Sequence, residues 1–322
     1  MENELKYKLW AVGGGKGGVG KSIVTLLLGT ILARKGKKVV LVDADLGGSN
    51  LHTLCGIKYP IYTLADFIKR KADNIEDVIM LTPIKNLELI CGADDILGVA
   101  NPKSTQKERI FKHLNKIDAD IILFDLGAGT SFTTMDFFLY APNKIVVLTP
   151  QITSIQNAYG FIKSSLYRLL VRRFGRDDDC YEIIKQLTSP GEDECIDSVI
   201  ELKTAFEGLG EQYYANLLMC LEELNLGIIV NMVRNRNESN VGNVVKDVAN
   251  NYLGLSPEYL GFVNYDRMLE SSINNMKDYL IKAIDNLAGS CIDDIASNIL
   301  IKNSNPESAI ANAAYLQTKG CQ

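Results

Sequence analysis

The sequence has little histidine and no paired cysteines. Its two histidines, His52 and His113, are too few and too far apart to suggest a histidine-rich metal cluster. The seven cysteines are scattered and never spaced as C-x-x-C. Neither a disulfide framework nor a zinc site is therefore indicated, and we expect reduced thiols.

Long hydrophobic runs and an excess of positive charge are also missing. Although 47% of the 322 residues are hydrophobic, no apolar run approaches the roughly 20 residues that a membrane-spanning helix needs. The net charge is −5, which argues against strong intrinsic binding to nucleic acid and leaves room for a local basic patch. No signal peptide is recognisable, and we expect a cytoplasmic protein with a large core.

Glycine is concentrated near the N-terminus, where residues 13–22 read GGGKGGVGKS. From Gly15 to Ser22 the spacing fits G-x-x-x-x-G-K-[ST], a phosphate-binding loop (P-loop). Glycines let such a loop bring backbone N–H groups onto phosphate oxygens. Lys21 would reach the β- and γ-phosphates, and the Ser22 hydroxyl would ligate Mg²⁺. The candidate nucleotide-binding residues are Gly15, Lys16, Gly17, Gly18, Val19, Gly20, Lys21 and Ser22.

The flanks of the loop have the required pattern. Residues 8–12 read as a short strand, and apolar residues recur at helical spacing from residue 23 until Lys35 and Gly36. Strand, glycine loop and helix together favour a P-loop over a glycine-rich turn with a chance lysine.

Lys16 is one lysine more than triphosphate binding requires, and from physics alone it is equally well a solvated loop lysine. Residues 16–22, KGGVGKS, resemble the deviant Walker A signature K-G-G-x-G-K-[ST] of the MinD/ParA family. The resemblance implies that Lys16 reaches across a nucleotide-sandwich dimer to the partner's ATP. A cation delivered in this way acts like an arginine finger, so hydrolysis would depend on dimerisation. Lys16 and Lys21 are therefore candidate catalytic residues.

A pair of acidic residues follows the next expected strand, residues 38–42. Asp43 and Asp45 are two apart and project to the same side, at the end of a parallel strand where open α/β sheets bind ligands. Turn chemistry alone would also explain an Asp-x-Asp before glycines. The family resemblance implies that Asp45 orients the attacking water and that Asp43 lies near the magnesium shell.

The segment 45–54, DLGGSNLHTL, looks like the FlhG/FleN branch of the family, which regulates flagellar number. In that family this region is a nucleotide-responsive switch that faces the dimer partner.

Asp125 ends a third buried run, because residues 119–130 read ADIILFDLGAGT. Apolar residues that end in aspartate are the Walker B pattern, in which a strand places one carboxylate on the magnesium shell. The pattern is weak alone and gains weight downstream of a P-loop. Leu126 departs from the family's common Asp-x-Pro/Ala-Gly form. Ser22, Asp43 and Asp125 are the candidate metal ligands.

Two later strands resemble family strands. After the strand expected at residues 144–150, the segment PQITSI resembles the family's P-E-P-T-S-I, with Thr153 or Ser154 expected to cap the next helix. Asn231 ends a further core strand, where the family's asparagine reads the adenine edge, although asparagine is also a common turn former.

The remaining segments match the family less well. Residues 174–225 exceed a usual crossover, so we expect a helical insertion on the rim of the sheet, either a partner-docking surface or an inert elaboration. Asn264 replaces a proline of the family's last strand. Residues 291–302 are amphipathic but acid-leaning, whereas helices that bind membrane surfaces favour lysine and arginine. A peripheral contact with the inner membrane is therefore left open.

These patterns predict an α/β fold, the three-layer P-loop NTPase fold with a mostly parallel central sheet flanked by helices. The expected division is an ATPase domain over residues 1–290, with the insertion at about 174–225, and a helical or flexible tail over 291–322.

The predicted function is an ATPase that uses ATP and Mg²⁺, forms a homodimer on ATP binding, and positions or counts a cellular structure such as flagella. A protein partner that stimulates hydrolysis is expected, and nucleic acid is not. The alternatives are an iron–sulfur cluster carrier, which would need the absent C-x-x-C, and a P-loop metabolic ligase or kinase.

Overall fold

The computed structural model describes residues 8–46, 48–92, 102–186, 199–267, 269 and 287–304. Within these residues the chain is built around one sheet in the order β3-β4-β2-β5-β1-β6-β7-β8. Neighbouring strands are parallel except β3, which runs antiparallel to β4. The strands are β1 (Leu9–Gly13), β2 (Val39–Asp43), β3 (Ile79–Leu81), β4 (Leu87–Ile90), β5 (Ile121–Asp125), β6 (Asn143–Leu148), β7 (Leu226–Val233) and β8 (Glu258–Asn264).

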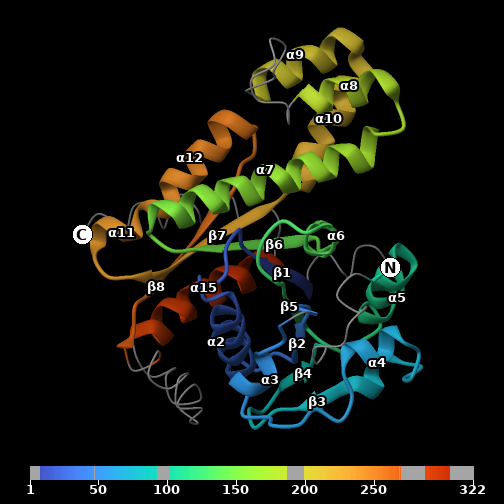
Figure 1. Cartoon of the computed structure of the whole chain (residues 1–322). Coiled ribbons are helices and arrows are strands. Elements are labelled where there is room, and N and C mark those ends of the chain that lie inside the picture. Colours follow the sequence, from blue (N-terminus) through green and yellow to red (C-terminus); the bar gives the residue numbers. More distant parts are fainter. Residues whose placement is uncertain are drawn as a thin grey trace.

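Helices cover both faces of this sheet, which confirms the predicted three-layer α/β fold (Figure 1). One face carries α2 (Lys21–Arg34) and α15 (Leu287–Ser304). The other carries α5 (Ser104–Leu114), α6 (Phe132–Tyr140), α7 (Ile152–Phe174) and α12 (Val241–Leu253). The described chain also contains short helices: α3 (Leu51–Leu54), α4 (Leu64–Ile68), η1 (Ile75–Val78) and α11 (Arg236–Ser239).

The strands divide their side chains between two hydrophobic clusters, one on each face. In β1, Leu9 and Ala11 belong to the cluster beneath α6 and α7, whereas Trp10 and Val12 belong to the cluster beneath α2. This alternation follows from the two-residue period of a strand. It explains why the core strands are continuous apolar runs, since both of their faces are buried.

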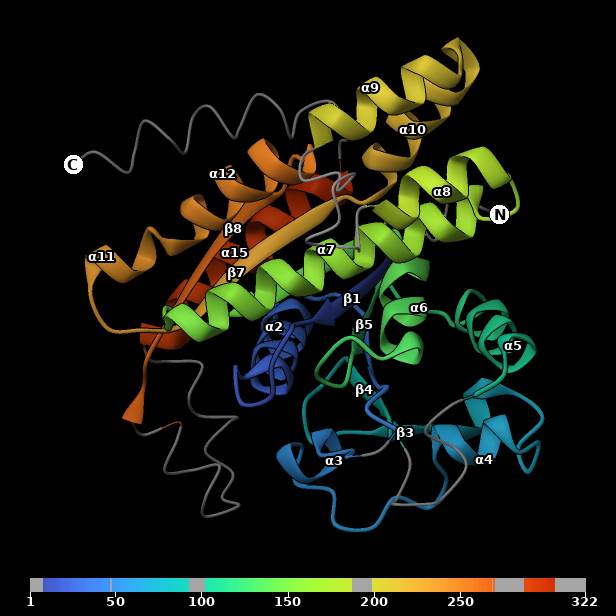
Figure 2. The same ribbon diagram turned by 45° about the horizontal axis from the view of Figure 1, so that its top comes forward.

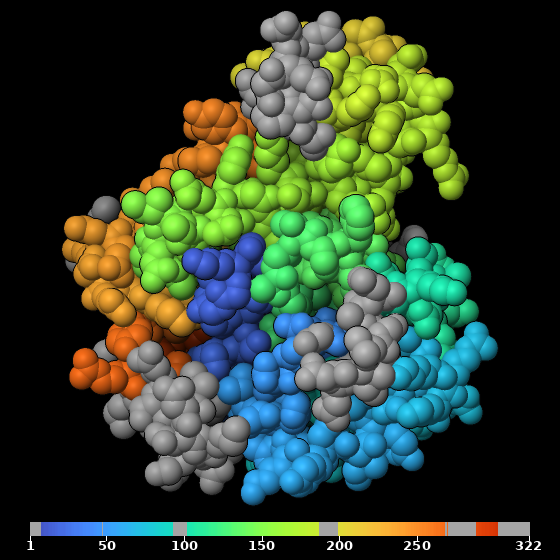
Figure 3. All heavy atoms as spheres, in the orientation of Figure 1, coloured from blue at the N-terminus to red at the C-terminus, as the bar shows by residue number. Residues whose placement is uncertain are grey.

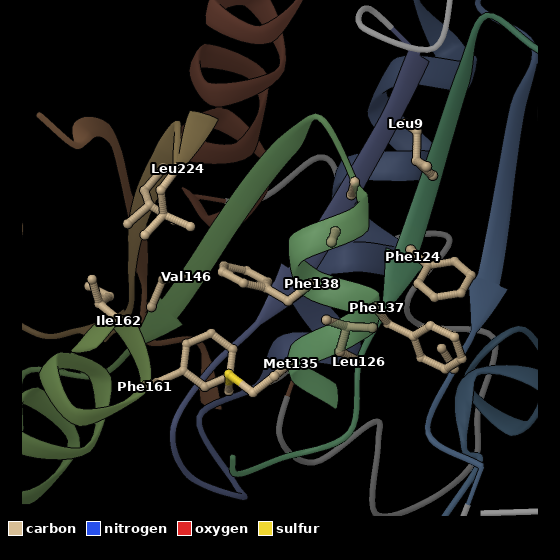
Figure 4. Packing of buried hydrophobic residues seen from close by; sticks show 14 of the residues in the cluster. Leu9, Phe124, Leu126, Met135, Phe137, Phe138, Val146, Phe161, Ile162 and Leu224 are labelled. Atoms are coloured by element: carbon tan, nitrogen blue, oxygen red, sulfur yellow. The ribbon is translucent and has the colours of Figure 1, made fainter. Parts of the chain in front are cut away.

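Aromatic side chains fill the space between α6 and the sheet. Phe138 and Phe161 pack edge to face with ring centroids 4.8 Å apart, and Figure 4 shows Met135 beside them. Phe124 of β5 and Phe137 of α6 make a second such contact at 5.3 Å. These contacts fix α6, and with it the loop that follows β5, against the sheet.

Among the described residues between α7 and β7, the chain forms the helices α8 (Asp178–Gln186), α9 (Val199–Leu209) and α10 (Glu211–Glu223). Figures 1 and 2 show them grouped around the far end of the 23-residue helix α7, beyond the body of the sheet. Buried residues of this group, among them Cys180, Phe206 and Leu217, continue the cluster beneath α7. The division of the chain into domains stays a prediction.

One strand was not expected, and one local expectation differs from the structure. Strand β3 is three residues long and partly exposed, and its sequence carries too little pattern to predict it. Gln151, not Thr153 or Ser154, is the N-cap of α7. The Ser154 hydroxyl instead accepts a 2.9 Å hydrogen bond from the Thr149 amide, which fastens the loop after β6 to the new helix.

Helix α15 is packed into the body of the fold. Its buried residues Ile292, Ile295 and Ile299 belong to the same cluster as α2, and Lys35 pairs with Asp293 at 2.8 Å. The predicted boundary at residue 290 falls inside this helix. The apolar face of α15, for which the sequence left a membrane contact open, is covered by other parts of the protein. Across the described residues, no helix has the length and apolar character needed to cross a bilayer.

Candidate nucleotide-binding site

Three neighbouring strands bring the predicted residues together at one edge of the sheet. The strand β5 lies between β1 and β2, and its last residue, Asp125, is paired in register with Val12 and with Asp43. The P-loop therefore leaves the sheet beside two carboxylates. In open α/β sheets this edge, at the carboxyl ends of the strands, is where ligands bind.

The P-loop itself runs directly into α2. Gly20 is the N-cap, with a left-handed φ of 86°, and Lys21 is the first helical residue. Beside Gly17 and Gly18 the space that a Cβ would occupy is open, since the nearest atom to either position is the Ala128 Cβ at 4.0 Å from Gly17. The loop thus forms an open cradle at a helix N-terminus, which suits an anion such as a phosphate.

Lys21 lies in a buried, negatively charged setting. It is 8% exposed, and burial lowers the pKa of its amine, whereas the carboxylates of Asp125 and Asp45 raise it. A partly dehydrated ammonium with carboxylates nearby is positioned to bind phosphate oxygens strongly.

Asp125 is buried at the centre of the site. Thr25 donates to its Oδ1 at 3.2 Å, and Ser22 also bonds to it. Burial and, to a smaller extent, the nearby Asp43 raise the pKa of Asp125 to about 7, against the opposing effects of Ser22 and Lys21. Burying the ionised form of Asp125 is unfavourable, and a bound cation would neutralise its charge.

The residues present fit a magnesium ion held with a nucleotide. Ser22, Asp125 and the adjacent Asp43 supply hydroxyl and carboxylate oxygens, which Mg²⁺ prefers, and phosphates and water usually complete its shell. Among the described residues no group of three or more histidines, cysteines or carboxylates forms a self-contained metal cage. The metal-ligand assignments remain predictions.

Asp43 lies beside Asp125 and also holds the loop that follows β2, which the sequence did not suggest. It is 1% exposed, and its carboxylate accepts hydrogen bonds from the backbone of Asp45, Asn50 and Leu51 and from the Ser49 hydroxyl. Burial raises the pKa of Asp43, and the hydrogen bonds from Ser49 and Leu51 oppose this effect.

Asp45 lies between the loops that follow β2 and β5. Its amide is fixed by Asp43 at 3.1 Å, and a Cβ placed on Gly127 would lie only 3.0 Å from its Oδ1. The absence of a side chain at Gly127 therefore allows the Asp45 carboxylate to rest against the second loop.

Lys16 is exposed, and its amine donates to the Thr153 hydroxyl at 3.5 Å. Two large apolar residues are exposed in the adjoining helices, Phe132 at 72% and Ile152 at 75%. In Figure 3, dark blue atoms from the start of the chain reach the surface beside green atoms of the α6 and α7 region. The predicted trans-acting lysine thus lies on an open face.

Asn231 contacts the P-loop directly. Its side-chain amide donates to the Val19 carbonyl at 2.9 Å, and a Cβ on Gly20 would lie 2.2 Å from that nitrogen. The next residue, Met232, has a left-handed φ of 61° in a region where the β7–β8 register shifts. The structure brings the predicted base-reading residue beside the phosphate loop, and its role toward adenine stays a prediction.

Sequence reasoning overlooked Thr25 and Ser49. Thr25 lies one helical turn after Lys21, and its hydroxyl contacts both the Lys21 carbonyl and Asp125, so helical spacing from the P-loop could have identified it. Ser49 had no such signal, because its partner is fixed by the path of the loop.

Comparisons with known proteins agree with this geometry. Residues 10–279 match the family described as the CobQ/CobB/MinD/ParA nucleotide binding domain. The chain is 34% identical over 155 residues to the antiactivator FleN of Pseudomonas aeruginosa, covering 48% of this chain and 54% of FleN. It is 32% identical over 165 residues to the flagellum site-determining protein YlxH of Helicobacter pylori, covering 51% of this chain and 55% of YlxH. The chain thus spans about half the length of these curated relatives.

A solved structure shows the same fold. The septum site-determining protein MinD from Pyrococcus horikoshii, complexed with Mg-ADP, superposes with a TM-score of 0.62 at 20% identity, covering 91% of this chain and 95% of that one. The family match extends over most of the chain and includes the P-loop, Asp43, Asp45, Asp125 and Asn231. The chain belongs to the CobQ/CobB/MinD/ParA nucleotide-binding domain family.

Proposed function

We propose that this chain is an ATPase that binds ATP with Mg²⁺, pairs with a second copy, and hydrolyses the nucleotide slowly within the pair. The observation that carries the proposal is the register of β1, β5 and β2, which brings the P-loop, Asp125 and Asp43 to one sheet edge. The family match supports nucleotide binding, and the P. horikoshii relative is complexed with Mg-ADP.

The roles in binding follow from the contacts. The open cradle at Gly17 and Gly18 would accept the phosphates, with the buried Lys21 amine beside them. Ser22 and Asp125 would hold Mg²⁺, with Asp43 adjacent. The bound ion would neutralise negative charge that develops on the phosphate oxygens.

Hydrolysis needs a positioned water and a further positive charge. The Asp45 carboxylate, held between two loops, would orient the water toward the γ-phosphate. Lys16 is exposed, and its amine makes a long 3.5 Å hydrogen bond to Thr153. The amine could exchange this bond for a contact with the triphosphate of a facing copy. The exposed side chains of Phe132 and Ile152 would add apolar contacts around it in the pair.

The names of the relatives support a positioning role, although YlxH is named for flagella and MinD of Thermotoga maritima for the septum. FleN is named an antiactivator and YlxH a flagellum site-determining protein. We propose a comparable task here, with a protein partner that stimulates hydrolysis and with work in the cytoplasm or at a membrane surface.

The test compares ATP turnover and oligomeric state of the wild type with Lys16→Ala, Lys21→Ala and Asp45→Ala. Lys21→Ala should lose ATP binding, Asp45→Ala should still pair but stop turning over, and Lys16→Ala should bind ATP without normal turnover. Lys58→Ala, an exposed loop lysine, is the matched control and should behave as wild type. Normal pairing and turnover in Lys16→Ala would refute the trans-acting lysine.

A further inference from the structure

One carboxylate holds most of the loop that carries Asp45. Asp43 accepts at Oδ2 from the Ser49 hydroxyl at 2.7 Å and from the amides of Asn50 and Leu51 at 3.0 Å each. Its Oδ1 accepts from the Asp45 amide at 3.1 Å. The two ends of the segment 45–51 are therefore tied to the same buried side chain.

The hydrogen bond from the Ser49 hydroxyl is the shortest of these four, and it is the one whose donor is a side chain. The three amide donors would be present with any non-proline residue at their positions, whereas the hydroxyl depends on serine. Hydrogen bonds to an ionised carboxylate are stronger than those between neutral groups. The hydrogen bond from residue 49 to Asp43 therefore depends on the hydroxyl of serine.

Gly92, two residues after the end of β4, makes room for this bond. A Cβ on Gly92 would lie 2.8 Å from the Ser49 Oγ, 2.9 Å from its Cβ and 3.0 Å from the Asp43 carbonyl oxygen. Both sides of the Asp43–Ser49 contact would be displaced by one methyl group. The contact can therefore be disturbed from outside the loop without removing any hydrogen-bonding group.

The Ser49–Asp43 bond is connected through Asp43 to Asp45, the predicted water-orienting residue. Asp43 fixes the Asp45 amide, and the Asp45 carboxylate rests against Gly127. A change at Ser49 would reach Asp45 through Asp43, while the phosphate cradle belongs to a different loop and the Asn231 contact to a different strand. Ser22 and Asp125, which are proposed to hold Mg²⁺, make none of the hydrogen bonds to Asp43 given above.

We propose that Ser49 and Asp43 form a latch that fixes the loop carrying Asp45, which makes Ser49 a positioning residue for ATP hydrolysis rather than for ATP binding. This inference rests on the proposed ATPase function. It assigns to Ser49 and Gly92 a role in turnover, with no contact to the nucleotide.

The test uses Ser49→Ala and Gly92→Ala in the full chain. Ser164→Ala and Gly160→Ala are the controls: both residues lie on α7, and a Cβ on Gly160 would meet no atom within 4 Å. Hydrogen exchange of the nucleotide-free protein measures the latch through the amides of Asn50 and Leu51. Steady-state kinetics measure kcat and the KM for ATP.

Both latch variants should exchange these amides about tenfold faster than wild type, because they lose a charge-assisted hydrogen bond. Their kcat should fall about tenfold or more, with the KM for ATP within about twofold, because a displaced Asp45 loses its alignment with the water. The two controls should match wild type in both measurements.

Unchanged exchange in Ser49→Ala and Gly92→Ala would overturn the latch. Faster exchange with unchanged kcat would overturn the positioning role, as would a loss confined to KM. If the wild type turned over no ATP, the proposed function would fail, and the exchange measurement would still decide whether the latch exists.

Discussion

At the residue scale, the site is built from buried polar groups whose partners lie far away in the sequence. Asn231 bonds to the Val19 carbonyl across 212 positions, and Thr25 reaches Asp125 across 100. Asn231 could be recognised at a strand end, and Thr25 only by its helical spacing from the P-loop. The actual partner of each depends on the register of the sheet, which no local pattern contains.

Gly15 provides a direct test of the P-loop geometry. A Cβ at this position would lie 1.9 Å from the Asn157 carbonyl oxygen of α7, so alanine must push the loop away from the helix. We expect Gly15→Ala to weaken ATP binding about tenfold or more, because the amides no longer converge on phosphate. Titration with a fluorescent ATP analogue measures this. Gly160→Ala is the control on the same helix, and equal affinities for the two variants would contradict the expectation.

Lys144 is a buried cation outside the site, and its amine contacts two helix ends. It is 3% exposed, and the amine donates to the Ala141 carbonyl at 2.7 Å, after α6, and to the Glu223 carbonyl at 3.4 Å, at the end of α10. Burial lowers the pKa of Lys144 to about 8, against the raising effect of Glu223.

The pH dependence follows from this lowered pKa. Between about pH 8 and 10.5 the unfolded chain binds more protons at Lys144 than the folded chain, so the stability from this group rises with pH. Relative to Lys144→Met, the wild type should gain about 2 kcal/mol in unfolding free energy between about pH 7.5 and 9.5. Urea unfolding of both proteins at the two pH values measures the difference. A difference that is independent of pH would contradict the lowered pKa.

At the scale of the elements, the sequence predicted best what depends on local period and on glycine spacing. The buried runs of β1, β2, β5, β6 and β7 and the P-loop before α2 were all recognisable from these signals. The antiparallel edge strand β3 was not, because three partly exposed residues carry no such signal. The start of α7 was misplaced because Ser154 resembles a cap but bonds to the loop after β6.

Helix α15 also shows that a local pattern does not predict tertiary packing, because its amphipathic sequence did not reveal what covers its apolar face. Ile295 is 1% exposed and would lie 3.0 Å from a Cβ on Gly261 of β8, so helix and strand are closely packed. Ile295→Ala should lower the unfolding free energy by about 2–5 kcal/mol, through lost burial and the cavity left behind. Chemical unfolding measures this, with the exposed Asp294→Ala as the control, expected within about 0.5 kcal/mol of wild type. Equal stability of the two variants would show that α15 does not belong to the cooperative core.

At the scale of the whole molecule, one face combines the features that pairing needs. The P-loop, Lys16 and the exposed Phe132 and Ile152 lie in neighbouring elements at the carboxyl edge of the sheet. The outlying helices α8 to α10 also expose a large apolar residue, Ile200, at 69%. The two isoleucines are matched in type and exposure but belong to different parts of the molecule.

This match allows the pairing face to be tested by one substitution at each position. Ile152→Glu should abolish the ATP-dependent dimer, because it places a charge beside the facing copy, while ATP binding by the monomer should persist. Ile200→Glu should pair as wild type does. Light scattering after size exclusion, with a non-hydrolysable ATP analogue present and absent, measures both. If Ile200→Glu prevented pairing and Ile152→Glu did not, the two copies would meet through the helical insertion, and Lys16 could not reach the partner's triphosphate.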